Sequence, residues 1–298
     1  MELRFNISVI TPSFNSASYI EDAIKSVLLQ DYDNFEHVVI DGGSTDGTLD
    51  ILKKYPHLKW ISQPDKGQSD AMNKGFRMSA GDIIVYLNAD DYFLPGAFKA
   101  IVPYFEKGAS FVVGKIRVEN DEGRPWINDP RIKHEEMLRH WENNAFPLNP
   151  VGYFYLREVQ EKIAFNEDNH FAMDLEFLLE CSLHFNFTKI VEDQPLGVFR
   201  LGKDSKTWKL EQEKQRMWDV RNFEFLDKFL GKKSEDFVRE FRQKQQEGYE
   251  FRISGKKRKR VKKIKEPSFR EKLLDFLTAP DKVKIIVRFI RRNIERKK

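Results

Sequence analysis

The chain has very little cysteine and no long apolar run, and each absence excludes a class of protein. Cys181 is the only cysteine among 298 residues, so we expect neither an intramolecular disulfide nor a cysteine-based zinc site. No stretch approaches the roughly 20 apolar residues that a membrane-spanning helix needs. The first residues lead into strand-like sequence without the pattern of a secretory signal peptide. We therefore expect a cytoplasmic protein.

Positive charge is concentrated near the C-terminal end. Residues 251–298 hold 19 Lys or Arg against 5 Asp or Glu, although the net charge of the whole chain is only +4. Residues 282–298 place apolar side chains at helical spacing among the basic ones, which is typical of a helix that lies on an anionic membrane surface. Such a helix predicts a peripheral location on the inner face of the cell membrane. The alternative is packing on the body of the protein or on a second subunit in a homo-oligomer. Nothing in this tail resembles a nucleic-acid-binding platform, so we expect no nucleic-acid partner.

Strand-like and helix-like segments alternate along the first hundred residues. Because the strands read as apolar runs between helices, they predict an α/β fold with a mostly parallel sheet covered on both faces. Ligands bind beyond the carboxyl ends of the strands in such sheets, and polar motifs follow these ends here. The expected strands are 5–10, 35–40, 58–62 and 82–87, and the expected helices are 17–29, 49–52 and 69–78.

The later segments are less regular. We expect further strands at 111–118, 151–156 and 191–200 and helices at 133–141 and 171–185. The domain boundaries that follow are a body over 1–207, a charged helical segment over 208–255 and a basic amphipathic extension over 256–298.

Two adjacent carboxylates, Asp90 and Asp91, follow the apolar strand that ends at Leu87. Adjacent carboxylates repel each other, and a divalent cation would relieve that repulsion. Mg²⁺ and Mn²⁺ take one or two carboxylates and fill their other positions with water and substrate phosphates. Such a metal neutralises charge on a diphosphate leaving group. The alternative is that Asp91 caps a helix.

Two other strand ends carry candidate binding residues. Asp41 is followed by two glycines, which let a backbone approach a ligand closely, and its carboxylate can accept a hydrogen bond from a base or a ribose. The alternative is a simple connection in which residues 44–46 cap the next helix. Phe14, in the segment 11–15, offers a ring on which a base can stack, although an aromatic residue at a strand end usually packs in the core.

These three motifs, over 8–15, 39–48 and 87–91, resemble those of the family 2 glycosyltransferases, which are inverting enzymes of the GT-A fold. The resemblance covers about residues 5–200. It implies a nucleotide-sugar donor, with UDP as the first choice, and a glycan or lipid-linked hydroxyl acceptor in surface polysaccharide or glycolipid synthesis. It also implies Mn²⁺ or Mg²⁺ as the cofactor, bound by Asp90 with Asp91 beside it. The implied nucleotide-binding residues are Thr11, Pro12, Phe14, Asp41, Asp65, Asn73, Asn88, Ala89 and Asp90.

The sequence departs from the family pattern at three positions. Asn88 replaces the first acid of the metal-binding D-x-D motif, and Gly42 replaces the second acid of a common Asp-Asp pair. Met72 stands where many members carry Arg. Segments 64–67 and 70–75 resemble another branch of the family, so the departures indicate a subgroup.

An inverting transfer needs a general base to take the proton of the acceptor hydroxyl. The resemblance points to Asp174, which stands near the edge of an apolar stripe at the start of a helix, where the helix dipole favours a carboxylate. The alternative is that Asp174 only stabilises the first helical turn. Glu176 and Asp168 are the other candidates.

A basic loop follows the last expected strand. Arg200, Lys203 and Lys206 resemble the loop that closes over the donor diphosphate, since Arg and Lys donate charge-assisted hydrogen bonds to phosphate. The alternative is a solvated loop without a ligand. For the whole chain, the competing hypothesis is a non-catalytic relative that binds a nucleotide or scaffolds a membrane complex.

Overall fold

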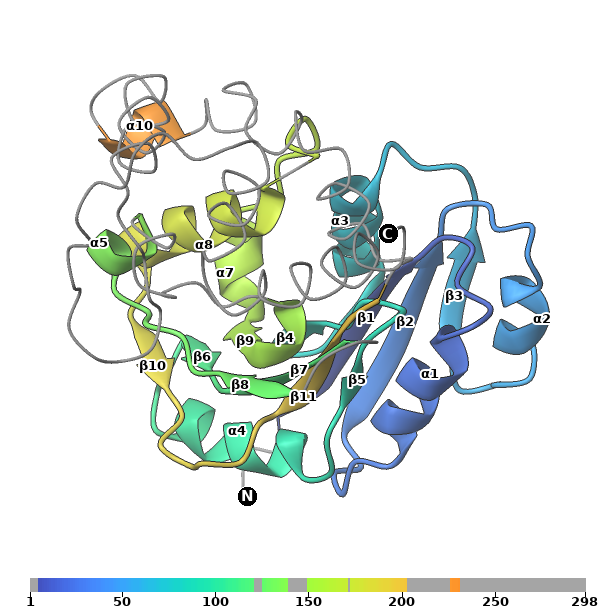
Figure 1. Ribbon diagram of the computed structural model, residues 1–298, viewed down its shortest axis with the longest axis horizontal. Helices are drawn as coiled ribbons and strands as arrows, with labels where there is room; N and C mark the ends of the chain where they lie inside the picture. The colour runs from blue at the N-terminus through green and yellow to red at the C-terminus, as the bar shows by residue number, and fades with distance from the viewer. Residues whose placement is uncertain (1–4, 121–124, 139–148, 171, 203–225, 231–298) are drawn as a thin grey trace, which may run out of the picture.

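The computed structural model describes residues 5–120, 125–138, 149–170, 172–202 and 226–230, and they form an α/β fold (Figure 1). A seven-stranded sheet has the order β10-β6-β9-β4-β1-β2-β3, and a second sheet has the order β5-β11-β7-β8. The expected fold class is confirmed. Lys203 and Lys206 lie outside the described residues, as do the whole segment 256–298, with its basic residues 282–298, and all of the segment 208–255 except residues 226–230.

The main sheet is parallel except at β9, which runs antiparallel to both β4 and β6. The register of β1 and β2 pairs Ser13 with Asp41, so two of the sequence motifs end side by side. The strands of this sheet are β1 (Ile7–Ser13), β2 (Phe35–Asp41), β3 (Lys59–Ser62), β4 (Ile83–Tyr86), β6 (Phe111–Val113), β9 (Tyr153–Leu156) and β10 (Phe187–Lys189).

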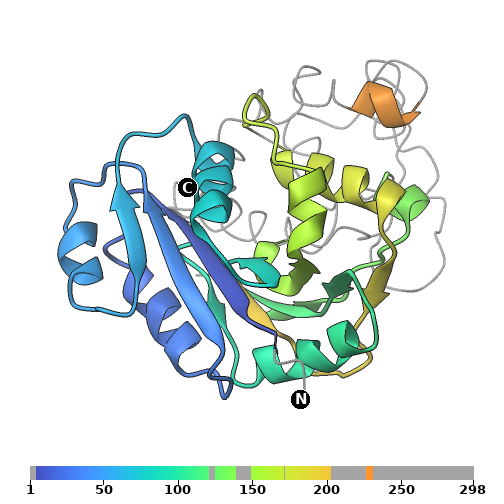
Figure 2. The same ribbon diagram turned by 180° about the vertical axis from the view of Figure 1, so that it is seen from behind.

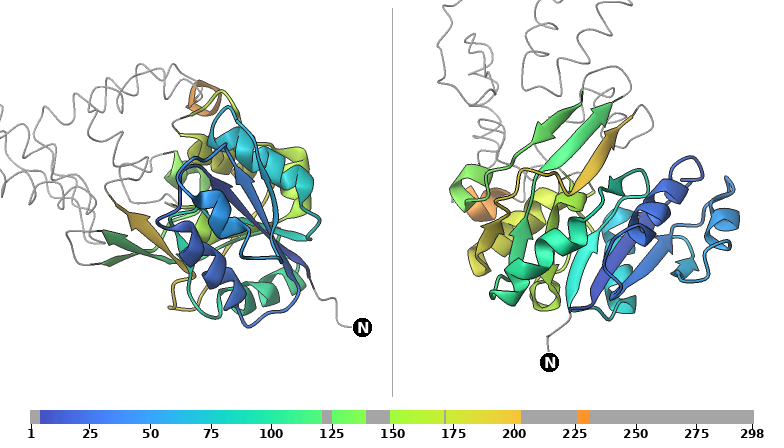
Figure 3. Two further views of the ribbon diagram at one scale, coloured as in Figure 1. Left: turned by 90° about the vertical axis from the view of Figure 1, so that its right-hand side faces the viewer. Right: turned by 90° about the horizontal axis from the view of Figure 1, so that it is seen from below.

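The smaller sheet projects from the side of the main sheet (Figure 3). Its strand β11 pairs parallel with β7 and antiparallel with β5, which directly follows Asp91. The end of β11 is thereby brought toward the turn that follows β4. The strands are β5 (Tyr92–Phe93), β7 (Ile116–Asn120), β8 (Trp126–Asn128) and β11 (Gly197–Leu201).

Helices cover both faces of the main sheet, because successive strand residues face opposite sides (Figures 1 and 2). Ile10 and Ile84 pack with side chains of α3, α7 and α8. Val9 and Val85 pack with side chains of α1 and α4 on the other face. None of the helices that the structure describes is both long and apolar enough to cross a bilayer. The helices are α1 (Ile20–Leu28), α2 (Thr48–Leu52), α3 (Gln68–Met78), α4 (Ala97–Glu106), α5 (His134–Met137), the 3-10 turn η1 (Pro150–Gly152), α7 (Arg157–Lys162), α8 (Met173–His184) and α10 (Asp227–Leu230).

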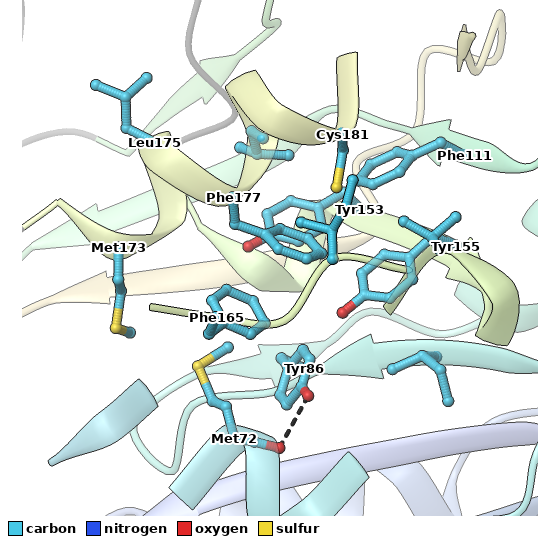
Figure 4. Close-up of a cluster of buried hydrophobic side chains, with 14 of the residues drawn as sticks. Met72, Tyr86, Phe111, Tyr153, Tyr155, Phe165, Met173, Leu175, Phe177 and Cys181 are labelled. Atoms are coloured by element: carbon cyan, nitrogen blue, oxygen red, sulfur yellow. Dashed lines mark hydrogen bonds between the residues drawn. The ribbon is translucent and has the colours of Figure 1, made fainter. Parts of the chain in front are cut away.

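Three buried tyrosines lie between the sheet and α8 (Figure 4). The hydroxyl of Tyr86 donates to the Met72 carbonyl at 2.9 Å, and that of Tyr155 donates to Gln160 at 2.8 Å. Both hydroxyls are therefore satisfied inside the core, as buried polar groups require. The hydroxyl of Tyr153 instead reaches Asp174 at the start of α8.

The expected single strand over 111–118 is wrong, because the chain passes from β6 to β7 and so from one sheet to the other at Gly114. A Cβ at Gly114 would lie 2.5 Å from Leu196 Cδ1, so a side chain at this crossing would require Leu196 to shift. The expected strand 191–200 begins only at Gly197, and the helix expected over 133–141 is described through Met137. The pattern did not predict α4, α7 or β10.

Helix α3 packs so closely on β1 that Gly75 has no room for a side chain. A Cβ there would lie 2.3 Å from Ile10 Cγ2 and 3.2 Å from Ile40 Cγ1. We expect Gly75→Ala to lower the free energy of unfolding by about 1–3 kcal/mol through overpacking, although alanine favours helix. Urea denaturation measures the change. Arg77→Ala, at an exposed position of the same helix, is the matched control, and an equal effect in both variants would contradict this packing.

Candidate active site

The candidate motifs gather at the carboxyl edge of the main sheet. Strand β1 ends at Ser13, beside Asp41 at the end of β2, and Asp41 pairs in turn with Ser62 at the end of β3. Strand β4 pairs with β1 on its other side and leads into the turn 88–91. The loops after these four strands therefore lie at one edge, as the sequence predicts.

Asp41 shapes the turn that follows β2. Its carboxylate is fully buried, and Oδ2 accepts hydrogen bonds from Gly43 N at 3.1 Å, Ser44 N at 2.9 Å and Ser62 Oγ at 2.7 Å. Oδ1 accepts from Ser44 Oγ at 2.5 Å. Four donors of the chain itself thus hold this carboxylate, and its contact with a nucleotide stays a prediction.

Phe14 and Asp65 lie side by side at this edge. The ring of Phe14 is 64% exposed, which is unusual for so large an apolar side chain. A Cβ at Gly42 would lie 2.7 Å from Asp65 Oδ2 and 3.3 Å from Phe14 Cδ2. Gly67 N donates to the other oxygen of Asp65 at 2.8 Å. The lack of a side chain at Gly42 thus leaves the room that the carboxylate of Asp65 occupies.

The side chains of Thr11 and Asn73 bind parts of the protein. Thr11 Oγ1 lies 2.9 Å from His37 Nε2, and both residues are fully buried. Pro12 is buried as well. Asn73 pairs with the backbone of Phe165, donating to its carbonyl at 2.9 Å and accepting from its N–H at 3.1 Å. Asn73 therefore fixes the loop that precedes α8, and the nucleotide contacts of these residues stay predictions.

Asp91 is a buried hydrogen-bond acceptor. Its Oδ2 accepts from Asn88 Nδ2 at 3.0 Å and from Asn149 Nδ2 at 2.7 Å, and its Oδ1 accepts from the backbone N–H of Arg200 at 2.9 Å. These bonds join the end of β4, the start of η1 and β11. They also account for Asn88, because its amide donates where a second acid would present only another acceptor. Ala89 is buried within the same turn.

Asp90, beside this acceptor, is half-buried. Burial raises the pKa of Asp90, while a backbone hydrogen bond and the charge of Arg200 act in the opposite direction. Burial and the charge of Asp90 hold the pKa of Asp91 well above its ordinary value. The guanidinium of Arg200 lies 4.6 Å from the ring centroid of Tyr92 and pairs with Asp22 at 2.7 Å. The structure thus brings Arg200 into the electrostatic field of Asp90.

The residues at the edge fit a divalent cation that shares its ligands with a substrate. Within the described ranges, no three His, Cys, Asp or Glu side chains gather as a metal-binding group. Mg²⁺ and Mn²⁺ often bind through one or two carboxylates and substrate phosphates, and Asp90 offers one such carboxylate. All three hydrogen bonds to Asp91 come from the protein, so metal binding by Asp91 stays a prediction.

Asp174 lies in the first turn of α8, where the positive end of the helix dipole favours a carboxylate. Tyr153 donates to its Oδ1 at 3.3 Å. Burial, followed by the charge of Asp174, holds the pKa of Tyr153 well above its ordinary value, so the phenol remains a donor. Asp174 is half-buried, whereas Asp168 is exposed and Glu176 is buried.

Sequence reasoning places Asn149 and Tyr153 in a segment that lines the acceptor side, but it does not predict the contacts of these two residues or of Ser13. Tyr153 and Asn149 act through hydrogen bonds to acids that are distant in sequence, a signal that a linear pattern does not carry. Ser13 Oγ is buried and has no hydrogen-bond partner among the described residues, although it stands at the strand end beside Asp41. The sequence indicates Ser13 only through its place in the segment 11–15.

The buried His37 generates a prediction about pH. Burial lowers the pKa of His37 to about 3, and the charge of His57 acts in the same direction. Because an unfolded histidine titrates near about 6.5, the unfolded state binds more protons between these values, and stability falls as the pH falls. We expect wild type to lose about 2 kcal/mol more than His37→Asn between about pH 7 and pH 5 in urea denaturation. His184→Asn, which removes a half-exposed histidine, is the matched control, and an equal slope in wild type and His37→Asn would contradict the assignment.

The sequence was compared with known families and proteins. Residues 8–173 match the family described as Glycosyl transferase family 2. An uncharacterized glycosyltransferase of Nostoc sp. is 38% identical over 171 residues, which are 53% of this chain and 52% of that protein. Chondroitin synthase of Escherichia coli is 34% identical over 230 residues, 72% of this chain and 32% of that protein. The chain thus spans about half or less of the length of these relatives.

Solved structures share the fold. TarS 1–349 of S. aureus, in complex with UDP-GlcNAc, has a TM-score of 0.55 at 19% identity, covering 75% of this chain and 73% of that one. The mannosyltransferase PcManGT of Pyrobaculum calidifontis, in complex with GDP-Man and Mn²⁺, has a TM-score of 0.52 at 20% identity, covering 74% and 64%. At these identities the likeness shows the fold alone, and it confirms the GT-A fold expected from the sequence. Since the family match extends over more than half of the chain, the protein belongs to glycosyl transferase family 2.

Proposed function

We propose that this protein transfers a sugar from a nucleotide-diphosphate sugar to a hydroxyl acceptor, with inversion at the anomeric carbon, in surface polysaccharide or glycolipid synthesis. The observation that carries the proposal is the half-buried Asp90 beside Arg200 at the carboxyl edge of the sheet. Its raised pKa means that the charged carboxylate gains from a nearby cation. The chondroitin synthase relative and the UDP-GlcNAc complex of TarS support a UDP-sugar as the first donor to test.

The nucleotide end of the donor would lie on the loops after β1, β2 and β3. The exposed ring of Phe14 offers a face for the base, and the carboxylate of Asp65 beside it can accept a hydrogen bond from a base N–H. Thr11, Pro12, Asp41 and Asn73 are buried, and we assign them to shaping these loops around the nucleotide.

The diphosphate would lie over the turn that follows β4. Mn²⁺ or Mg²⁺ held by Asp90 would neutralise charge that develops on the leaving diphosphate. Arg200 supplies a second positive charge from β11, and its guanidinium can donate charge-assisted hydrogen bonds to phosphate oxygens. Asn88, Ala89 and Asp91 hold the turn in place, with Asp91 as a supporting residue. The contribution of Lys203 and Lys206 stays a prediction outside the described residues.

Asp174 would act as the general base. Its carboxylate takes the proton of the acceptor hydroxyl as that oxygen attacks C1 of the sugar and the bond from C1 to the diphosphate breaks. The hydroxyl of Tyr153 donates to Oδ1 of this carboxylate, and we assign to Tyr153 the role of orienting the base. Segment 149–154, which carries Tyr153, is our assignment for the acceptor side.

Removing the charge of Asp90 tests the metal assignment. We expect Asp90→Asn to lower kcat/KM by about 10²–10³ and to abolish stimulation by Mn²⁺, because electrostatic stabilisation of the leaving group is lost. The assay measures nucleoside diphosphate released from a panel of UDP-sugars and GDP-mannose, with Mn²⁺ or with EDTA. Asp50→Asn, an exposed acid of α2, is the control. Undiminished Mn²⁺-dependent turnover in Asp90→Asn would refute the assignment.

Replacing the carboxylate of Asp174 tests its assignment as the general base. We expect Asp174→Asn to lower kcat by about 10²–10⁴ while donor binding, measured by thermal shift with UDP-sugars and Mn²⁺, stays at the wild-type level. Asp168→Asn, at an exposed position nearby, should keep wild-type turnover. If wild type binds donors but releases no nucleoside diphosphate from any of them, the protein is a non-catalytic relative.

A further inference from the structure

The loop that leads into α8 is held from two sides. On one side, Asn73 of α3 pairs with the backbone of Phe165. On the other side, Glu176 of α8 accepts from Asn169 Nδ2 at 2.8 Å and from Asn166 Nδ2 at 3.1 Å. Asn169 Oδ1 in turn accepts from the N–H of Ala172, which directly precedes α8, at 2.9 Å. The start of the helix that carries Asp174 therefore depends on the carboxylate of Glu176.

Lys228 supplies the charge that compensates Glu176. Its Nζ lies 3.3 Å from Glu176 Oε1 and 3.0 Å from Glu180 Oε2. Glu176 is only 8% exposed, and a buried carboxylate is costly unless it is paired and hydrogen-bonded. Burial works against the charged form of Lys228, but Glu180 and Glu176 outweigh it and raise the pKa of this ammonium group.

The segment that carries Lys228 is anchored against the same core. Leu226 is fully buried in the cluster between the main sheet and α8, and Phe229 packs against that cluster. These two apolar contacts, on either side of Lys228, hold this segment of the chain against the core. Lys228 thus meets α8 from a fixed position, although 52 residues separate it from Glu176 along the chain.

We propose that Lys228 is a positioning residue of the transfer reaction, which acts through Glu176 and the Asn166–Asn169 loop to hold Asp174 in place. The proposal rests on the proposed role of Asp174 as the base. It assigns Glu176, one of the candidate bases, to positioning, because its carboxylate is already bound by two amides and an ammonium group. It also connects Glu176 and Lys228, which follow the end of the family match at residue 173, to the transfer reaction.

This role predicts an effect on turnover with little effect on donor binding. The donor residues Phe14, Asp65 and Asp90 lie on loops that Lys228 does not order, whereas a shift of a catalytic group by about 1 Å can cost about 10²-fold in rate. We expect Lys228→Met to lower kcat by about tenfold and to leave the donor KM within about twofold of wild type. Lys228→Arg, which keeps the charge, should restore most of the lost turnover.

The experiment uses the full chain and the donor that wild type turns over best among UDP-sugars and GDP-mannose with Mn²⁺. Lys53→Met, which removes an exposed ion pair with Asp50 far from α8, is the matched control and should equal wild type. In a Glu176→Gln background, Lys228→Met should have no further effect on kcat, because the carboxylate that links Lys228 to the Asn166–Asn169 loop is gone and only the pair with Glu180 remains. Additive losses, or a wild-type kcat in Lys228→Met, would overturn the proposal.

Hydrogen exchange gives a readout that is independent of activity. The backbone N–H groups of Asp168 and Asn169 donate to Asn166, at 3.1 and 3.3 Å. The backbone N–H of Ala172 donates to Asn169 at 2.9 Å. We expect these amides to exchange faster in Lys228→Met than in wild type or Lys53→Met. Unchanged exchange overturns the proposal. If wild type turns over none of the donors, the proposed function fails, and hydrogen exchange alone decides whether Lys228 orders this loop.

Discussion

The arrangement of the site depends on one buried carboxylate, that of Asp91. A buried polar group must have its hydrogen bonds satisfied by the protein, and Asn88, Asn149 and the backbone of Arg200 supply them to Asp91. These three donors come from different parts of the fold. The hydrogen bonds to Asp91 therefore hold the turn after β4 against the smaller sheet, and they place Arg200 near Asp90.

The acidic residues at the carboxyl edge consequently divide into two kinds. Asp41 and Asp91 are fully buried and accept hydrogen bonds from the chain, so these hydrogen bonds stabilise the loops around them. Asp90 and Asp174 are half-buried. Asp90 lies in the turn that the buried Asp91 holds in place, and Asp174 accepts a hydrogen bond from the buried Tyr153. We assign the chemistry to the second kind. The departures at Gly42 and Asn88 fit this division, because each accommodates a neighbouring acid, Asp65 in one case and Asp91 in the other.

Helix α8 shows how the core and the site are joined. Phe177 stacks on Phe165 with ring centroids 4.2 Å apart, and Phe165 is also the residue whose backbone Asn73 holds. Tyr153 belongs to the same apolar cluster (Figure 4), and its hydroxyl donates to Asp174. The position of the proposed base is thus set by close packing, which tolerates little displacement, together with a small set of polar contacts.

The sequence alone determined the α/β class, the parallel strands of the first half and the edge where the motifs meet, because these follow from local periodicity and from the direction of parallel strands. It missed α4 and the break at Gly114, since the membership of β6 and β7 in different sheets is not visible in local periodicity. Only the tertiary structure decided which acids are buried and what holds them. The donors to Asp91 from Asn149 and Arg200 stand 58 and 109 residues away in the sequence, beyond the reach of any local pattern.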